Sequence, residues 1–491
     1  MRIDYTVAMS ILLSIDDDAL AVYEVLVAAG HEAYFVGGAI RDALLRQQPK
    51  DWDIATSALP KQIIELFSRA GLHTRYSSNS LRHGTVTVIL NGIAVEITTY
   101  RSEQGYIDGR HPTELHFISD INKDLARRDF SINSIAYSPT FGILDPNGGI
   151  PDLKNGVLRT IGNAEERLGE DALRIMRALR FSAMLGFSID NELAESLHHC
   201  KEMLTNIAVE RLTFELLQML AAKNILQVLL DYPDVLAVFI PEITATIGFA
   251  QNSPYHIYDV WQHTAYAMAA IPAVPTIAAT PAAPAATDSL ALPNRCNKLD
   301  GSVDNSYIIA RLALLFHDLG KPLTYTEDQT GRGHFYGHDV VGANIVEKRM
   351  AALRFPRRHR ELCSTIVRYH SSGIQPSNII RWLNRLGEEC LRILLDVKRG
   401  DIIAHSEINK EDRLLGVANC QLALNSYLNG RSAYRLSDLE VNGNDILAMG
   451  VAPGPVVGKV LNRLLEAVID GRLANEKSVL LTETSLLLRA K

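Results

Sequence analysis

Long uninterrupted apolar runs are absent from the 491-residue chain, and its cysteines follow no regular spacing. A helix that spans a bilayer needs about 20 predominantly apolar residues, so we expect no membrane-spanning segment. The apolar stretch 7–15 is too short for one, and it lacks the basic start and small-residue cleavage site of a signal peptide. The five cysteines are odd in number and widely scattered, which argues against a disulfide framework and indicates the reducing cytoplasm.

A strong excess of charge of either sign is also missing. The formal net charge of −7 argues against a protein that coats nucleic acid without specificity. Arginines nevertheless cluster at 127–128, 174–180 and 353–360, which is compatible with a local basic track. The contents of 47% hydrophobic and 21% charged residues are ordinary for a globular protein. The length suffices for about three or four domains.

Two adjacent glycines, Gly37 and Gly38, end an apolar strand predicted over 34–37 and precede a helical pattern over 39–46. Because glycine has no Cβ, backbone N–H groups at such a turn can approach an anionic ligand closely. Arg41 lies in the first turn of the helix, where its guanidinium can hold a phosphate through two donors. The glycine pair taken alone is equally typical of an ordinary turn.

Two aspartates, Asp51 and Asp53, follow with only Trp52 between them. On a strand over 51–55 this spacing places both carboxylates on one face, and paired hard oxygen ligands suit Mg²⁺. Taken alone, such a pair is also common on protein surfaces. Glu96 lies among β-branched residues of another strand, where it is either a third metal ligand or solvent-facing. The strands around this hairpin are expected at 84–90 and 93–99, joined by Asn91-Gly92.

Four further helices and one long polar loop are expected in the first 190 residues. The loop is either functional or disordered, because irregular segments of its length are uncommon in compact domains. In the third helix, Phe130, Ile132 and Ile135 form the core face. The helices are predicted at 16–32, 60–69, 124–137 and 165–186, and the loop at 101–117.

Three charged residues of the last of these helices, Asp171, Arg174 and Arg177, recur at a spacing of three and are neighbours on one face. A solvated charged ladder is the plain interpretation. One acceptor with two donors can also match the polar edge of cytosine or adenine, so that the protein takes the place of a template base.

Five motifs in one order resemble the bacterial class II tRNA nucleotidyltransferases, the CCA-adding enzymes, over about the first 250 residues. They are Gly37–Asp42, Asp51-X-Asp53, Asp108–Pro112, Arg127–Asn133 and Glu170–Arg174. The resemblance implies a polymerase-beta-like nucleotidyltransferase core, tRNA, CTP and ATP as partners, and two Mg²⁺ ions as cofactors.

The resemblance also implies roles for single residues. Gly38 and Arg41 would contact the triphosphate, and Asp51, Asp53 and Glu96 would be the catalytic carboxylates, with the two aspartates holding the metal ions. The segment 101–117 would be the flexible loop that switches from C to A addition. The remaining residues would contact ribose, phosphate or base: Arg128, Asp129 and Asn133, then Asp171 and Arg174 with support from Arg177 and Arg180.

A second constellation begins at His263 and is interrupted by an Ala/Pro/Thr-rich tract near 271–306. The tract cannot bury a core and is expected to be disordered or extended. A His-Asp doublet, His317-Asp318, ends an apolar helix, and further histidines lie on later helices. Imidazole and carboxylate ligands suit Mn, Fe, Ni or Zn, with Mg as a further candidate. The pattern resembles the HD phosphohydrolase superfamily. That resemblance implies His263, His317, Asp318 and Asp401 as metal ligands, extended by His338 and His370.

The predicted fold class is therefore an α+β nucleotidyltransferase domain with a mixed sheet, followed by an all-α remainder that includes an HD domain. We expect a head at 1–150, a helical neck and body with the base-reading helix at 151–250, the HD-type domain at 251–405 and a helical C-terminal tail at 406–491. The HD domain is either an active phosphatase or phosphodiesterase on RNA ends or a degenerate RNA-binding body.

The predicted function is template-independent addition of C, C and A to the 3′ end of tRNA, in the cytoplasm and away from membranes. Three alternatives stay open. They are a poly(A) polymerase or A-adding enzyme, an HD-centred phosphohydrolase of RNA ends, and a non-enzymatic RNA chaperone. The chaperone is disfavoured, because such a protein has no need of two metal constellations.

Overall fold

The computed structural model describes residues 15–106, 112–273, 306–430 and 432–489 of the chain. It divides into two compact units, which are described separately below. Unit 1 comprises Met1–Pro241 with Ala273–Asp300, and unit 2 comprises Glu242–Pro272 with Gly301–Lys491. The expected apolar segment 7–15 and most of the Ala/Pro-rich tract, 274–305, lie outside the described residues.

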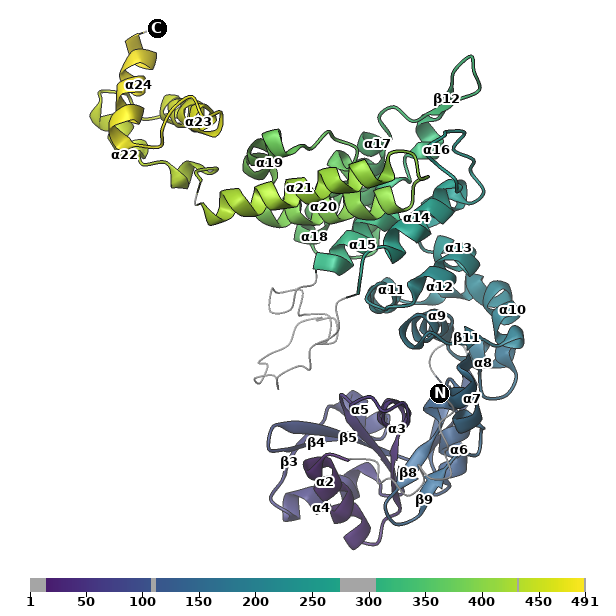
Figure 1. The fold of residues 1–491 in the computed structure, drawn as a ribbon. Helices are drawn as coiled ribbons and strands as arrows, with labels where there is room; N and C mark the ends of the chain where they lie inside the picture. Colours follow the sequence, from purple (N-terminus) through teal and green to yellow (C-terminus); the bar gives the residue numbers. More distant parts are fainter. Residues whose placement is uncertain (1–14, 107–111, 274–305, 431, 490–491) are drawn as a thin grey trace. The chain divides into compact units, whose positions relative to one another are not determined.

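Unit 1 begins with a seven-stranded sheet of order β3-β4-β5-β2-β1-β8-β9 (Figure 1). The pairing of β2 with β5 is parallel and the other pairings in this sheet are antiparallel, which confirms the mixed sheet. Helices α2 and α4 pack against it. The strands are β1 (Ala33–Val36), β2 (Trp52–Thr56), β3 (His73–Arg75), β4 (Thr85–Leu90), β5 (Ile93–Thr99), β8 (Ala136–Ser138) and β9 (Gly142–Leu144).

The helices of this head begin where the sequence provides caps. Asp16 precedes α2, and its carboxylate accepts the backbone N–H groups of Asp18 and Ala19. Pro60 occupies the first turn of α4, where its missing N–H costs nothing. The helices are α2 (Asp17–Ala28), α3 (Gly38–Leu44), α4 (Pro60–Arg69), α5 (Ser78–Arg82), α6 (Ile121–Ala126) and α7 (Gly149–Asn155).

Two predictions in unit 1 are wrong in part. The segment 101–117 is not an irregular loop, because β6 (Arg101–Tyr106) and β7 (Pro112–Phe117) pair as an antiparallel hairpin. Residues 107–111, which hold most of the Asp108–Pro112 motif, lie outside the described residues. The segment 124–137 is not one helix, because α6 ends at Ala126 and a short 3₁₀ turn, η1, covers Ser131–Asn133.

The helix expected over 165–186 is also interrupted. Asp171 has extended backbone angles, φ −143° and ψ 100°, and separates α8 (Ala164–Glu170) from α9 (Leu173–Leu185). Its carboxylate accepts the N–H of Leu173 at 3.2 Å, the local bond by which aspartate competes with a continuous helix. The rest of unit 1 is β10 (Val157–Leu158), β11 (Ser188–Ile189), α10 (Asn191–Cys200), η2 (Lys201–Asn206), α11 (Val209–Leu220), α12 (Ile225–Asp231) and α13 (Pro233–Ala237).

Unit 2 is largely helical, which confirms the expected fold class. Arg311 is almost fully buried in α15, where it donates to the carbonyl oxygen of Ile271 just after α14. The first helices of unit 2 are α14 (Val260–Ala269), α15 (Ser306–His317), α16 (Lys321–Thr324), α17 (His338–Ala352), α18 (Arg357–Tyr369), α19 (Ile379–Leu386), α20 (Glu388–Ile403) and α21 (Lys410–Asn429). Strands β12 (Thr326–Glu327) and β13 (Gly333–His334) form a short antiparallel pair.

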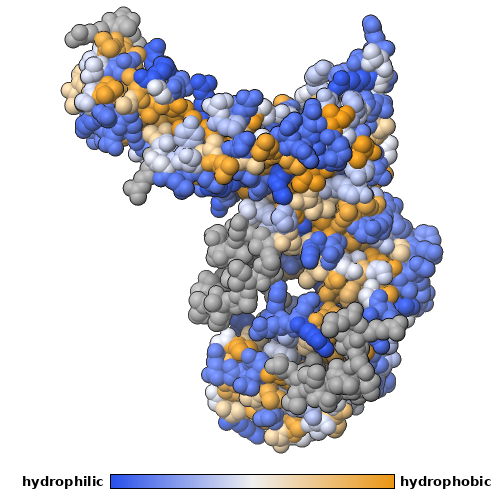
Figure 2. Space-filling view, viewed as in Figure 1, coloured by the Kyte–Doolittle hydropathy of each residue, from blue (hydrophilic) through white to orange (hydrophobic). Residues whose placement is uncertain are grey.

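The last helices of unit 2 have a core of their own. Leu464 and Leu480 are fully buried there together with Ile446. The elements are α22 (Gly443–Ala448), α23 (Pro455–Ile469) and α24 (Lys477–Arg489). Apolar and hydrophilic residues are interspersed over the visible face of the molecule (Figure 2). Within the described ranges, no helix combines the length and the apolar character needed to cross a membrane.

Candidate functional site

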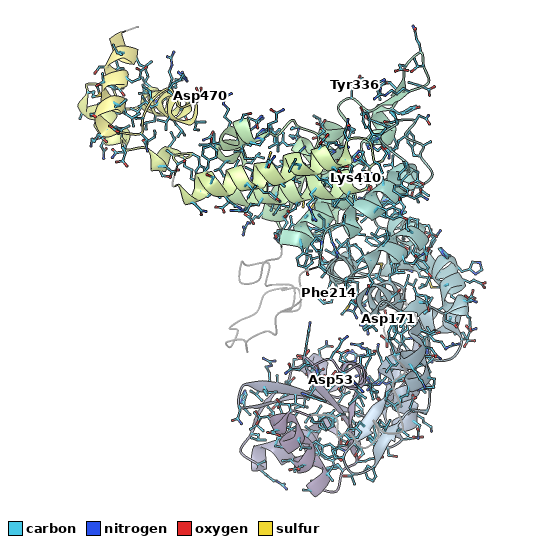
Figure 3. The ribbon with its side chains drawn as sticks, viewed as in Figure 1. Asp53, Asp171, Phe214, Tyr336, Lys410 and Asp470 are labelled. Atoms are coloured by element: carbon cyan, nitrogen blue, oxygen red, sulfur yellow. The ribbon has the colours of Figure 1, made fainter. Side chains whose placement is uncertain are left out.

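Two carboxylates face the same side of neighbouring strands in the head sheet. Asp53 in β2 is the register partner of Glu96 in the parallel strand β5, and Asp51 directly precedes β2. Asp53, labelled in Figure 3, is partly buried. Asp51 and Glu96 are exposed. Burial and the negative charge of Glu96 raise the pKa of Asp53 to about 6, against the lowering effect of Arg128. A divalent cation bound between these carboxylates would stabilise their ionised forms.

The glycine corner lies next to Asp53. Val36, the last residue of β1, is the register partner of Asp53, and Gly37 follows with φ +75°. A Cβ at Gly37 would lie 3.4 Å from Nη1 of Arg128 and 3.8 Å from Oδ2 of Asp53. These are ordinary contact distances, so it is the positive φ that favours glycine here.

A chain of buried polar side chains runs from the glycine corner to α9. Arg41 donates from Nε and Nη2 to Oδ1 of Asp42, at 2.8 and 2.6 Å, and from Nη1 to Oδ1 of Asn133 at 2.8 Å. Asn133 donates to Oδ1 of Asp129 at 3.1 Å. Asp129 in turn accepts Nε of Arg177 at 2.9 Å. Burial alone would raise the pKa of Asp129, but Arg177 and the hydrogen bonds lower it to about 2.

The predicted base-reading residues lie just before α9 and along it, and they are held by other parts of unit 1. Arg174 is buried, and its Nη1 donates to Oε2 of Glu170 at 2.6 Å and to the carbonyl oxygen of Arg167 at 2.8 Å. Asp171 lies 3.7 Å from Nη2 of Arg211 in α11. Arg180 forms an ion pair of 3.1 Å with Glu215, a residue that sequence analysis did not identify. The proposed contacts of these residues with a base stay predictions.

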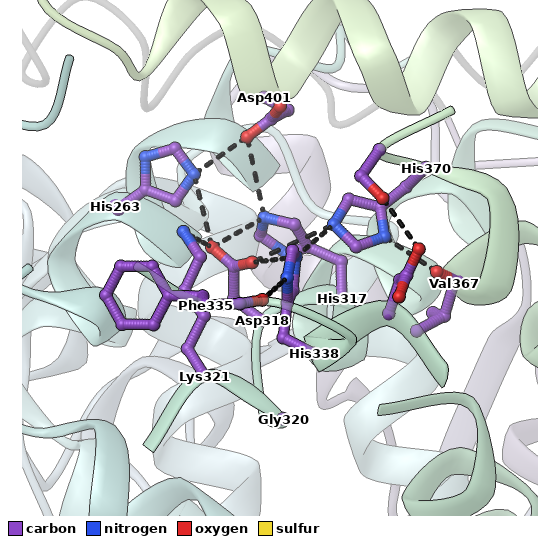
Figure 4. A network of polar contacts seen from close by, with 12 residues as sticks. His263, His317, Asp318, Gly320, Lys321, Phe335, His338, Val367, His370 and Asp401 are labelled. Atoms are coloured by element: carbon purple, nitrogen blue, oxygen red, sulfur yellow. Dashed lines mark hydrogen bonds and ion pairs between the residues drawn. The ribbon is translucent and has the colours of Figure 1, made fainter. Parts of the chain in front are cut away.

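Unit 2 brings the predicted histidines and aspartates together (Figure 4). Asp318 lies at the centre of the cluster, since its Oδ2 is 3.1 Å from Nε2 of His317 and its Oδ1 is 3.6 Å from Nε2 of His338. Two groups each place their ligand atoms within 4.8 Å of one another and could hold a metal ion. The first group is His263, His317 and Asp401, and the second is Asp318, His338 and His370.

The second ring nitrogen of each histidine is occupied by the backbone. Nδ1 of His317, His338 and His370 lies 2.6–2.7 Å from a carbonyl oxygen of the preceding turn, and Nδ1 of His263 lies 3.4 Å from the carbonyl oxygen of Ala404. A carbonyl only accepts, so Nδ1 carries a proton and Nε2 is the atom that faces the cluster. A metal ion bound at Nε2 of His317 would replace the second proton, which the neighbouring carboxylates favour there. Nε2 of His338 and His370 are only 3.1 Å apart, and the buried Nε2 of His317 has no hydrogen-bond partner. Converging lone pairs in a buried site fit a metal cation.

The charges of the cluster act strongly on one another. Burial by itself lowers the pKa of His317, but Asp318 and Asp401 raise it to about 10. Burial lowers the pKa of His370 to about 3, with a further contribution from the neighbouring positive charge of His317. Burial alone would raise the pKa values of Asp318 and Asp401, but the surrounding histidines, with Lys321 at Asp318, keep both well below the usual range.

Sequence analysis gave no role to three residues that shape this cluster. Nζ of Lys321 lies 2.7 Å from Oδ2 of Asp318, and the spacing of three between them in the sequence could have indicated the contact. Nδ1 of His405 lies 3.8 Å from Oδ1 of Asp401, four residues earlier on α20. A Cβ at Gly320 would lie 2.2 Å from the carbonyl oxygen of His338, so only glycine allows this approach of the two segments.

Four family models match parts of the chain. The poly A polymerase head domain matches residues 33–159, and a probable RNA and SrmB-binding site of polymerase A matches 186–247. The HD domain matches 294–406, and tRNA nucleotidyltransferase domain 2 matches 403–484. The chain is 46% identical over 197 residues to the CCA-adding enzyme of Anoxybacillus flavithermus, which covers 40% of this chain and 48% of that one. In these parts the chain is similar to the class II CCA-adding enzymes.

Another relative of this family is the CCA-adding enzyme of Bacillus subtilis, with 42% identity over 216 residues, 43% of this chain and 53% of that one. The chain thus spans about half the length of the curated relatives that it matches. Its fold resembles the Bacillus stearothermophilus CCA-adding enzyme in complex with CTP, with a TM-score of 0.65, 24% identity, and coverage of 96% and 97%. The Thermotoga maritima CCA-adding enzyme complexed with tRNA has a TM-score of 0.59, 19% identity and 98% coverage of both chains.

Proposed function

We propose that the chain adds C, C and A to the 3′ end of tRNA from CTP and ATP. The observation that carries this proposal is the placement of Asp53 and Glu96 on one face of β2 and β5, beside the turn at Gly37. The raised pKa of Asp53 fits a site that is completed by divalent cations, for which we propose Mg²⁺. Asp51, Asp53 and Glu96 would hold two ions, which supply activation of the attacking hydroxyl and stabilisation of the leaving pyrophosphate.

The chain's own residues orient the nucleotide in this proposal. Backbone N–H groups after Gly37 and the guanidinium of Arg41 would contact the triphosphate. Arg41 is held from two sides by Asp42 and Asn133, so its position is fixed before a nucleotide arrives. Contacts of Arg128, Asp129 and Asn133 with ribose and phosphate belong to the same proposal. Base selection would fall to residues at the start of α9, namely Asp171 and Arg174 with Arg177 and Arg180.

The test is an extension assay with tRNA that lacks all three terminal residues, supplied with each nucleoside triphosphate alone and with CTP and ATP together. The proposal expects two cytidines with CTP, and CCA with both. An added poly(A) tract, or A added only to tRNA already ending in CC, would select the polymerase and A-adding alternatives. Asp53→Ala should abolish extension and retain part of the nucleotide binding. Asp17→Ala, an exposed acid on α2, serves as the matched control and should extend tRNA normally.

A second activity is favoured by the cluster in unit 2. We propose that it is a divalent metal phosphohydrolase acting on RNA ends, because two groups of mostly buried metal-type ligands lie side by side there. Asp318 belongs to the second group, and its Oδ2 lies 3.1 Å from Nε2 of His317 in the first. Mn, Ni, Fe, Zn and Mg are the candidate ions. Asp51→Ala should still hydrolyse RNA that ends in a 2′,3′-cyclic phosphate, and Asp318→Ala should not. Failure of Asp51→Ala to hydrolyse it would leave the cluster as a structural part of an RNA-binding body. Given tRNA and nucleoside triphosphates as substrates, we place the protein in the cytoplasm.

A further inference from the structure

Three guanidinium groups surround the ring of Phe181 on α9. The Cζ atoms of Arg41, Arg177 and Arg180 lie 5.1, 5.3 and 4.5 Å from the ring centroid. Phe181 is only 6% exposed, and its ring also meets the ring of Phe130 edge-on, with 5.7 Å between the centroids. Cations within about 6 Å of an aromatic centroid are attracted by the ring, most strongly where water is excluded.

The three arginines come from elements that are far apart in the sequence, since Arg41 lies on α3 and the others lie on α9. Each has its own acidic partner, which is Asp42 for Arg41, Asp129 for Arg177 and Glu215 for Arg180. These ion pairs fix each guanidinium to a different part of unit 1. Phe181 is the contact that all three share, so the ring sets the distances between the arginines.

We propose that Phe181 is a positioning residue for the nucleotide. It holds the proposed triphosphate contact, Arg41, in register with the α9 arginines that support base selection, and this inference rests on the function proposed above for the head. A nucleoside triphosphate presents several negative charges along its phosphates and a polar base edge at its other end. Arginines held at fixed separations in a water-poor site bind such a ligand without first having to be ordered.

The experiment measures equilibrium binding of CTP and ATP to the full chain, in parallel with KM and kcat for tRNA extension. Phe181→Leu removes the ring but keeps an apolar side chain, and Phe181→Tyr keeps the ring. Phe67→Leu is the matched control, because Phe67 is a fully buried phenylalanine on α4 in the head core. Thermal unfolding of each variant shows whether it folds. If Phe181→Leu does not fold, Phe181→Met takes its place, since methionine adapts to irregular space.

The expected result is a loss of affinity for CTP and ATP of about tenfold in Phe181→Leu, the order that a desolvated cation–π contact supplies. KM should rise more than kcat falls. Phe181→Tyr should bind within about threefold of wild type, and Phe67→Leu should bind normally despite a lower Tm. Wild-type affinity in a folded ring-less variant, equal losses in Phe181→Tyr, or equal losses in Phe67→Leu would each overturn the inference.

The two readouts separate this inference from the proposed function. A wild-type chain that binds CTP through Phe181 but extends no tRNA would refute CCA addition and leave the positioning role in place. A wild-type chain that binds neither CTP nor ATP would overturn both. Normal extension together with ring-independent binding would overturn the role of Phe181 alone.

Discussion

Asp53 and Glu96 are register partners on the parallel strands β2 and β5, so the sheet holds two acids of like charge on one face. Backbone hydrogen bonding keeps the two residues adjacent on the sheet. The arrangement lowers the stability of the metal-free fold, because burial and the neighbouring charge disfavour the ionised form of Asp53. The arrangement is therefore a cost that a bound cation would remove.

This cost leads to the first prediction, which concerns stability without metal. In EDTA at pH 8, Asp53→Asn should raise the free energy of unfolding by about 1–2 kcal/mol, less than the ~3 kcal/mol that the same pKa difference carries for a fully buried group. The pKa of Asp53 is about 6 when folded and 3.8 ordinarily. As the pH falls from 6 to 4, Asp53 is protonated in the folded wild type before it is protonated in the unfolded chain. The difference in unfolding free energy between Asp53→Asn and wild type should therefore shrink over this range. Urea unfolding at pH 4, 6 and 8 checks this, and an advantage that grows toward pH 4 would contradict it.

A second prediction concerns the turn at Gly37. Gly37→Ala should destabilise the protein by about 1–3 kcal/mol, because alanine is strained at this positive φ, and should weaken CTP binding. The added Cβ would also come into contact with the side chains of Arg128 and Asp53 and cover this part of the site. Gly30→Ala is the control, since Gly30 has φ +84° with no atom within 4 Å of the added Cβ. It should lower Tm and leave CTP affinity unchanged. Equal effects of both variants on affinity would show that the turn acts through stability alone.

The third prediction concerns the ion pair of Asp129 with Arg177. Asp129→Asn should cost about 3 kcal/mol of unfolding free energy at pH 7, since breaking a buried pair leaves one charge without its partner. The pKa of Asp129 is lowered to about 2, so the contribution of the pair is complete above the ordinary value of 3.8 and is lost as the pH falls toward 2. The double variant Asp129→Asn with Arg177→Gln should be more stable than additivity predicts. A double-mutant cycle by urea unfolding measures this coupling, and a coupling near zero would contradict it.

The comparison of sequence with structure shows which features are local. The strand Trp52–Thr56 with its aspartates, the turn at Gly37 and the hairpin at Asn91-Gly92 follow from spacing and turn chemistry, and the structure contains all three. The break at Asp171 was not predicted, because residues 165–186 keep a helical apolar pattern on both sides of it. The aspartate stops the helix through its own hydrogen bond to Leu173, which periodicity does not report.

Other features depend on contacts that no local pattern contains. The segment after Ala126 leaves the helix because β8 pairs with β1 and Asp129 binds Arg177, 48 residues later. Glu215 could not be selected as the partner of Arg180, because it reads as one more polar residue on an amphipathic helix. In unit 2, the ligand types were evident from the sequence. The division of these ligands into two adjacent groups, with Asp318 of one group next to His317 of the other, depends on the three-dimensional arrangement of α14, α15, α17, α18 and α20.

The fourth prediction counts metal ions in unit 2. In a chain already carrying Asp51→Ala and Asp53→Ala, metal analysis after loading with Mn²⁺ should find about two ions per chain, since two ligand groups are present. His370→Ala should reduce this to about one, and Asp318→Ala to near zero because both groups use or adjoin its carboxylate. His198→Ala, an exposed histidine in unit 1, is the control and should change nothing. Unchanged metal content in Asp318→Ala would refute the shared site.

The last prediction concerns Arg311, a buried cation that fastens the end of α14. Arg311→Met should lower the unfolding free energy of unit 2 by about 1–3 kcal/mol, because the carbonyl of Ile271 loses its donors. The exposed Arg332→Met is the control and should have little effect. Ile271 precedes the segment 274–305 and Arg311 follows it, so their hydrogen bonds join the two sides of the segment directly. Replacing 274–305 with a short Gly/Ser linker should therefore leave the unfolding transition of unit 2 nearly unchanged. Thermal unfolding checks both variants, and a linker variant that loses more stability than Arg311→Met would show that the tract itself contributes to the fold.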